Sequence, residues 1–146
     1  MKRARSIRLQ PKLLLGLVAM AAVLAAILAP SIAQLYRARM EELLALWRTK
    51  ERVDVLALPS LDVVCVECWL SPEESHAAIF RADSLDCYND FLKGLFAPDV
   101  KKASHGVKAL CRALLAEGIA PGGFVFDTEV AAYLLAPADG SYDLEK

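Results

Sequence analysis

The sequence predicts an α/β protein with a mixed β-sheet, and three features lead to this prediction. Three β-prone runs, at residues 53–58, 61–70 and 76–81, are joined by short turns, which favours an antiparallel meander. After residue 84, helical and β-prone segments alternate, which favours parallel strands with helices between them. The length of 146 residues suits one domain. We therefore expect one sheet that combines both kinds of pairing.

The first 36 residues differ from the rest of the chain. Residues 1–12 carry five basic side chains and no acid, and residues 13–36 carry no charge. An apolar helix over 13–36 would be long enough to cross a bilayer, which needs about 20 residues, with the basic flank cytoplasmic. The same pattern, with Ser31-Ile32-Ala33 before Gln34, also resembles a secretory signal with a cleavage site. Three interpretations stay open: a membrane anchor, a cleaved signal, or a start foreign to the domain behind it.

Residues 37–50 predict an amphipathic helix, and residues 51–81 predict the meander. The helix has apolar residues at helical spacing: Tyr36, Met40, Leu43, Leu44 and Trp47. The strand at 61–70 shows period-two alternation, with one wholly apolar face made of Val64, Val66, Cys68 and Leu70. The turn at 71–75 contains Pro72 and leads into the third strand.

The second half of the chain predicts three helices and two short strands. Ser84 is expected to cap a helix that points Leu85, Tyr88, Leu92 and Leu95 at the core. A helix from Val107 to Gly118 shows an apolar stripe of Val107, Leu110, Cys111, Leu114 and Leu115. Short strands are expected at 101–103 and 124–126. Asp127 is expected to cap a last helix over 128–135.

The charge distribution argues against strong nucleic-acid binding by residues 13–146. They hold 12 Lys and Arg against 18 Asp and Glu, so their net charge is 12 − 18 = −6. Binding to phosphates needs clustered basic residues that release counterions. Because stacking platforms for single strands accompany a basic groove, Trp47 and Trp69 are expected to be core anchors.

Two segments near the end of the chain resemble the 3′–5′ exonuclease domain of bacterial DNA polymerase I, a family A DNA polymerase. One is Phe126-Asp127-Thr128-Glu129-Val130-Ala131-Ala132-Tyr133-Leu134-Leu135-Ala136-Pro137, followed by Tyr142-Asp143-Leu144. The other is Val100-Lys101-Lys102-Ala103-Ser104-His105-Gly106-Val107-Lys108, which is similar to the family's Lys-Lys-x-Gly-His-Asn-x-Lys segment. Residues 51–103 match it only in element order. The resemblance implies a ribonuclease-H-like fold of which residues 51–146 form the N-terminal half.

The resemblance also implies that the domain is inactive. Such exonucleases hold two metal ions with four acids, which orient the attacking water. The family's Asp-x-Glu pair falls on Val55 and Ala57, and its third acid falls on Leu110. The fourth acid belongs to a segment after Lys146. No catalytic residue, metal or cofactor is therefore expected.

The expected function is a structural one within a DNA polymerase I-like protein. By resemblance, the partner is the polymerase domain of the same chain, with DNA bound through that domain and little or none by this part alone. Such a protein would be cytoplasmic. The alternative is a single-pass, membrane-anchored interaction protein that uses a vestigial exonuclease fold and has a cytoplasmic N-terminus.

Other candidate site residues favour structural roles. Cys65 and Cys68 lie three apart within one strand, so their thiols should point to opposite faces, unlike a zinc or redox pair. All four cysteines are expected to be buried free thiols of a reducing compartment. His105 is expected to shape a helix start and His76 to be solvated. Gly122-Gly123 lacks the surrounding residues of a phosphate-binding loop.

Overall fold

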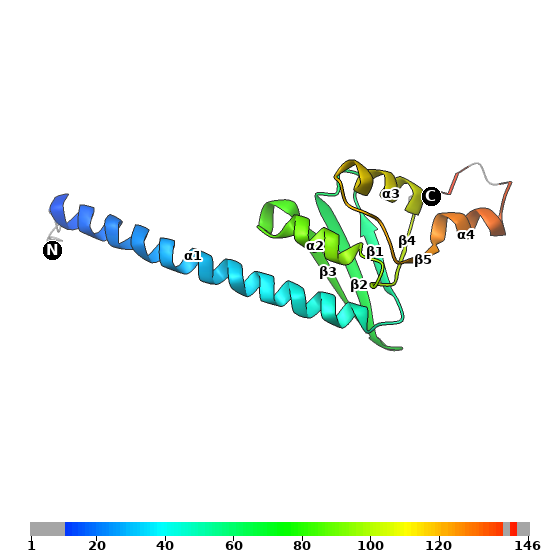
Figure 1. The fold of residues 1–146 in the computed structure, drawn as a ribbon, viewed down its shortest axis with the longest axis horizontal. Helices are drawn as coiled ribbons and strands as arrows, with labels where there is room; N and C mark the ends of the chain where they lie inside the picture. The colour runs from blue at the N-terminus through cyan, green and yellow to red at the C-terminus, as the bar shows by residue number, and fades with distance from the viewer. Residues whose placement is uncertain (1–10, 139–140, 143–146) are drawn as a thin grey trace, which may run out of the picture. The chain divides into compact units, whose positions relative to one another are not determined.

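The computed structural model describes residues 11–138 and 141–142, without the side chains of 11–15 and 27–33. It confirms the α/β prediction (Figure 1). The elements in chain order are α1 (Pro11–Arg48), β1 (Val53–Ala57), β2 (Val63–Ser71), β3 (Glu74–Arg81), the 3₁₀ helix η1 (Ala82–Ser84), α2 (Tyr88–Leu95), β4 (Lys102–Ser104), α3 (Val107–Ala116), β5 (Phe124–Asp127) and α4 (Thr128–Leu135). Most of the basic segment 1–12 lies outside the described residues, as do Asp143 and Leu144.

Helix α1 joins two segments that the sequence separated. The apolar stretch 13–36 and the amphipathic stretch 37–50 belong to one continuous helix, which ends at Arg48. The chain forms two compact units, Met1–Tyr36 and Arg37–Lys146, and α1 contributes to both. Within the described residues, no helix carries an apolar stretch long enough to cross a membrane. Part of the predicted span over 13–36, at 13–15 and 27–33, has side chains outside the described residues.

The sheet has five strands in the order β3-β2-β1-β4-β5. β1 pairs antiparallel with β2, and β2 pairs antiparallel with β3, as the short turns predicted. β1 pairs in parallel with β4, and β4 pairs in parallel with β5. Parallel neighbours need a crossover connection. Helices α2 and α3 supply these crossovers, so the mixed sheet follows from the alternation in the sequence.

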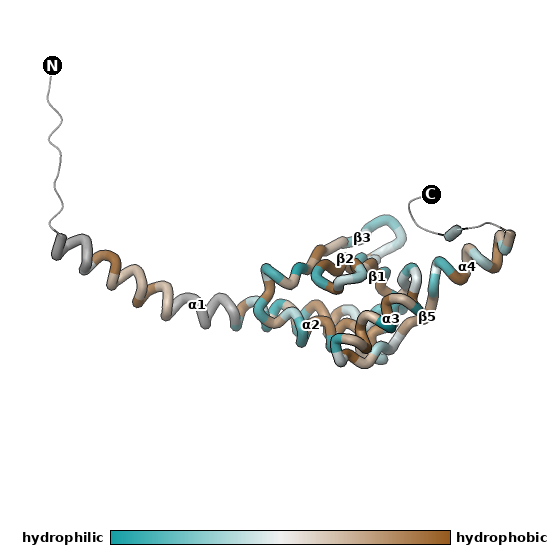
Figure 2. Tube along the Cα trace, turned by 90° about the horizontal axis from the view of Figure 1, so that it is seen from above, coloured by the Kyte–Doolittle hydropathy of each residue, from teal (hydrophilic) through white to brown (hydrophobic). Residues whose placement is uncertain are grey.

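One face of the sheet is covered by helices and forms the core. Figure 2 shows α2 and α3 on the same side of the strands. The core includes residues of α1, α2, α3 and the facing side of the sheet: Met40, Leu44, Trp47, Val53, Val55, Val64, Val66, Phe91, Leu95, Leu110 and Leu114. Trp47 is 2% exposed and its ring meets Phe80 edge-on at 5.9 Å, so its predicted core role is confirmed.

The start of α2 differs from the prediction. α2 begins at Tyr88, and Ser84 ends the preceding turn η1 without capping a helix. The Ser84 hydroxyl donates to the Asp83 carboxylate, which also pairs with Arg81. The hydroxyl therefore bonds to its neighbour in the chain, whereas the hydroxyl of a capping serine accepts a hydrogen bond from a backbone N–H of the helix. The four predicted core residues, Leu85, Tyr88, Leu92 and Leu95, are all buried.

Tyr88 connects α2 to the loop before β2. Its hydroxyl donates to the Leu61 carbonyl at 2.8 Å, and burial raises the pKa of Tyr88 to about 12. Leu61 is buried and adopts a left-handed backbone conformation, with φ 58°. This conformation is unfavourable for a leucine, so surrounding contacts must hold it.

Removing this hydroxyl should destabilise the fold. The variant Tyr88→Phe leaves a buried carbonyl without its donor and should lower the free energy of unfolding by about 1–2 kcal/mol. Urea denaturation followed by circular dichroism measures the loss. Tyr36→Phe is the control, because Tyr36 is 55% exposed. Equal stability of the two variants would show that the Tyr88–Leu61 bond does not support the loop.

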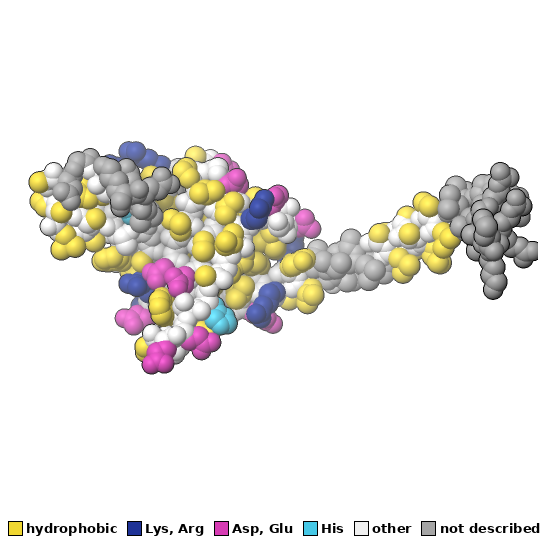
Figure 3. Space-filling view, turned by 180° about the vertical axis from the view of Figure 1, so that it is seen from behind, with side chains coloured by type: hydrophobic (Ala, Val, Ile, Leu, Met, Phe, Trp, Pro, Cys, Tyr) yellow, Lys and Arg dark blue, Asp and Glu magenta, His cyan; other side chains and the backbone are white. Residues whose placement is uncertain are grey.

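The opposite face of the sheet has no helix packed on it in the described part of the chain. Hydrophobic side chains remain on this surface (Figure 3). Leu56, Trp69 and Ile79 are 52%, 48% and 69% exposed. The prediction that Trp69 is a core anchor is therefore wrong. Trp69 lies on the face of β2 opposite to Val64, Val66 and Cys68, and the helices cover only that second face.

Candidate functional site

Two of the residues at the predicted acid positions lie close together in space. Val55 is buried in β1, while Ala57 ends β1 and Leu110 lies on α3. Ala57 and Leu110 line one pocket of about 440 Å³, beside Ala109 and Ala113. Parallel pairing of β1 with β4, followed directly by α3, carries Leu110 to the end of β1. Residues 53 positions apart in the sequence therefore meet at one site.

The chemistry of this pocket, which we name the β1–α3 pocket, is mostly apolar. Among the described residues that line it, the ionisable groups are His105 and Glu129. One carboxylate and one imidazole offer few ligands for divalent ions, which bind several carboxylate oxygens in two-metal sites. The described residues contain no cluster of three or more His, Cys, Asp or Glu placed to hold a metal ion.

Asp127 organises the neighbouring junction between α3 and α4. One of its carboxylate oxygens accepts from the Glu129 N–H at 2.9 Å, which confirms the predicted cap of α4. The carboxylate also accepts from Gly106 N at 3.1 Å and from Val107 N at 2.9 Å, at the start of α3. Asp127 thus caps two helices. The second role follows from the parallel register Ser104↔Asp127, which sequence spacing does not reveal.

The two histidines lie where the sequence placed them. His105 directly precedes Gly106, the N-cap of α3, and its Nδ1 is 2.9 Å from the Thr128 hydroxyl of α4. This contact adds a second link between the two helix starts. His76 is in β3, and its exposed side chain lies 3.5 Å from the Glu74 carboxylate.

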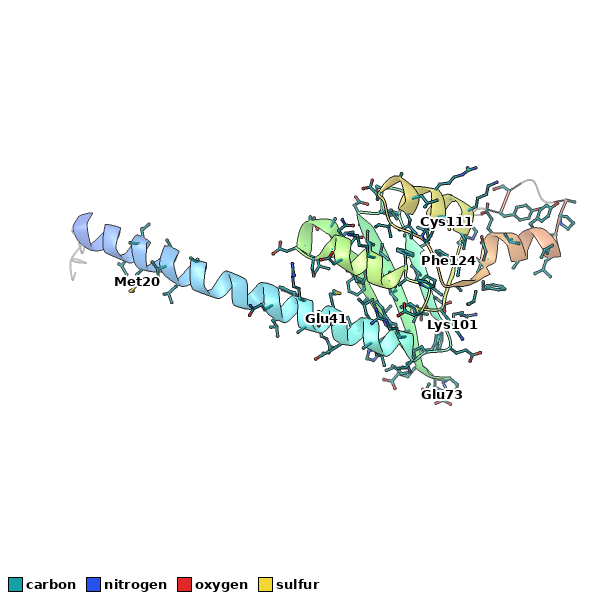
Figure 4. All side chains as sticks on the ribbon, in the orientation of Figure 1. Met20, Glu41, Glu73, Lys101, Cys111 and Phe124 are labelled. Atoms are coloured by element: carbon teal, nitrogen blue, oxygen red, sulfur yellow. The ribbon has the colours of Figure 1, made fainter. Side chains whose placement is uncertain are left out.

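The four cysteines are free thiols, but only two are buried. Cys68 is buried, and Cys65 lies on the other face of β2, as the period-two pattern predicted. Cys65 is only half-buried, so the prediction that it is buried is wrong. Cys87 is buried, whereas Cys111 on α3 (Figure 4) is half-buried. The apolar stripe of α3 is narrower than predicted, because Leu115 is 60% exposed. Burial and the nearby Asp127 charge raise the pKa of the Cys111 thiol.

Lys102 is fully buried, which the sequence did not reveal. Its Nζ donates to three backbone carbonyls, those of Val100 and Gly122 at 2.6 Å and of Ala97 at 3.2 Å. The amine also lies 5.2 Å from the centre of the Phe124 ring. Burial lowers the pKa of Lys102 to about 8, with the charge of Asp99 opposing this shift.

The loop around Lys102 leaves no room for a larger residue at position 123. Gly123 has φ +73°, and an added Cβ would collide with the Val100 carbonyl oxygen and approach Lys102 Nζ at 2.6 Å. The glycine pair at 122–123 therefore encloses this lysine.

A second cavity lies on the uncovered face of the sheet, near the starts of β1 and β4. We name it the Trp69 groove. Its volume is about 750 Å³, and it is lined by Lys50, Glu51, Arg52, Trp69, Lys101, Val125 and Phe126. Trp69 and Phe126 are 48% and 46% exposed. The groove thus combines exposed aromatic rings with three basic side chains.

The chain was compared with known protein families and with curated proteins. It matches no family model and no curated sequence.

Proposed function

We propose that residues 51–146 are an inactive 3′–5′ exonuclease-like domain of the DNA polymerase I kind, with a structural role. One observation carries the proposal: Ala57 and Leu110, at two positions where the resemblance expects metal-binding acids, line the same β1–α3 pocket. Two positions chosen from sequence motifs alone would not be expected to meet unless the motif alignment were meaningful. Val55, at the other position of the Asp-x-Glu pair, lies two residues before Ala57 on the same face of β1.

The sheet topology supports the same proposal. An antiparallel β1–β2–β3 meander, extended by parallel β4 and β5, is the arrangement expected of a ribonuclease-H-like domain. In this role the domain offers surfaces instead of chemistry. Its partner is the polymerase module of such an enzyme, DNA is bound through that module, and the setting is the cytoplasm.

Restoring acids in the β1–α3 pocket tests the assignment of these positions. The double variant Ala57→Glu/Leu110→Asp should place two carboxylates in one pocket beside Glu129 and create a divalent-ion site. We expect about 5 mM MnCl₂ to stabilise this variant by about 1 kcal/mol or more, because an ion that binds only the folded state stabilises it. Thermal denaturation with MnCl₂ and with EDTA measures the shift. The wild-type chain should show none.

A matched control keeps the charge and moves one acid away from the pocket. In Ala57→Glu/Leu115→Asp the second acid lies at an exposed position of α3, so manganese should have little effect. Equal manganese stabilisation of both double variants would refute the positional assignment. A 3′-labelled oligonucleotide tests the wild-type chain directly. Digestion that requires Mg²⁺ or Mn²⁺ and stops with EDTA would refute the proposed inactivity.

A further inference from the structure

The Trp69 groove lies at the other end of β1 from the β1–α3 pocket. Lys50 and Arg52 precede β1, and Lys101 precedes β4 (Figure 4), whereas Ala57 ends β1. The parallel pairing of β1 with β4 brings these two strand starts together, with Val53 N–H bonded to the Lys101 carbonyl. The two sites share no lining residue. The groove is thus separate from the site of the proposed exonuclease-like domain.

The groove is locally basic within an acidic domain. Its lining has three basic side chains and one acid, Glu51. Arg52 Nε lies 3.1 Å from the Asp54 carboxylate. A guanidinium has five N–H donors in a fixed fork, so this ion pair leaves others for a ligand. Because residues 13–146 sum to −6, a local excess of positive charge marks this groove as the place where an anion would be attracted.

The aromatic residues add a second kind of recognition. Trp69 lies near the end of β2 on the uncovered face, and Phe126 lies on β5. Both rings are about half-exposed. Proteins that bind single-stranded nucleic acids stack bases on exposed aromatic rings, and basic side chains nearby bind the phosphates. The volume of about 750 Å³ lies within the roughly 300–1,000 Å³ range of small-molecule sites.

We propose that the Trp69 groove binds a nucleotide unit, with the base stacked on Trp69 or Phe126 and the phosphate held by Lys50, Arg52 and Lys101. The unit is either a free mononucleotide or part of a single strand, since the two share a base and a phosphate. This binding site goes beyond the proposed inactive exonuclease-like domain. It does not depend on that assignment, because its residues come from the opposite ends of the strands.

Titration of the full-length chain with AMP, with a (dT)₈ oligonucleotide and with inorganic phosphate tests the proposal. Trp47 is 2% exposed and Trp69 is 48% exposed, so stacking should quench fluorescence from Trp69 alone. Calorimetry should show that Trp69→Leu weakens binding by at least about 5-fold, because base stacking on an aromatic ring contributes to affinity. Lys101→Gln should weaken binding too. It should also reduce the slope of log K against log[salt] for (dT)₈ binding by about 0.7 in magnitude, because one phosphate contact is lost.

Two control variants separate recognition from general effects. Lys93→Gln removes an exposed lysine of α2 outside the groove, and Ile79→Ala removes an exposed apolar residue of the same sheet face. Both should bind as the wild type does. Tighter binding of (dT)₈ than of AMP identifies single strands as the ligand, and equal binding identifies mononucleotides. Failure of both probes to bind, inorganic phosphate binding as tightly as AMP, or unchanged affinity in Trp69→Leu and Lys101→Gln would overturn the proposal.

Discussion

Replacing Asp127 with alanine should lower the free energy of unfolding by about 2–4 kcal/mol, because one carboxylate caps two helices. It accepts from Gly106 N and Val107 N at the start of α3 and from Glu129 N at the start of α4. The loss leaves three backbone N–H groups without this acceptor at two positive helix ends. Urea denaturation followed by circular dichroism measures the change in stability.

Two further variants distinguish capping from a loss of charge. Asp127→Asn keeps one side-chain carbonyl oxygen as an acceptor and should lie between the wild type and Asp127→Ala. Asp86→Ala removes an exposed aspartate and should change stability by less than about 0.5 kcal/mol. If Asp127→Ala were as stable as Asp86→Ala, the junction between α3 and α4 would not depend on this carboxylate.

Raising the pH from about 7.5 to about 10 should stabilise the wild type relative to Lys102→Met by about 2 kcal/mol. Burial lowers the pKa of the Lys102 amine from 10.5 to about 8. Between these pKa values the unfolded chain holds the proton that the folded chain has released. Because the unfolded state then binds more protons, the stability conferred by this site rises with pH through the window.

The difference between two variants isolates this effect. Burial raises the pKa values of Tyr88 and Cys111, so their ionisation lowers stability as the pH rises and opposes the contribution of Lys102. Lys102→Met retains these opposing groups and removes only the amine. Lys101→Met, at the exposed neighbouring lysine, should keep the wild-type pH dependence. Parallel pH profiles for Lys102→Met and Lys101→Met would contradict a buried amine with a lowered pKa.

The sequence by itself determined the order of elements and most of the core. Local patterns were sufficient here, because period-two alternation places Cys65 and Cys68 on opposite faces and helical spacing places Leu92 and Leu95 inward. Asp127 was identified as a cap from its position before a helix, since that interaction is with a neighbour in the chain. The apolar residues at Val55, Ala57 and Leu110 were likewise visible without coordinates.

Only the tertiary structure decided which residues from distant segments meet. The parallel pairing of β4 with β5 brings Asp127 to the N–H of Val107, 20 residues earlier in the chain, and so lets it cap a second helix. Lys101 and Lys102 are neighbours in the sequence, yet Lys102 is buried among backbone carbonyls, whereas Lys101 is exposed in the Trp69 groove. Trp47 and Trp69 are the same residue type, but Trp47 is buried and Trp69 is half-exposed, because helices cover only one face of the sheet. Burial and site geometry arise from these long-range contacts, whereas propensity and periodicity act within single elements.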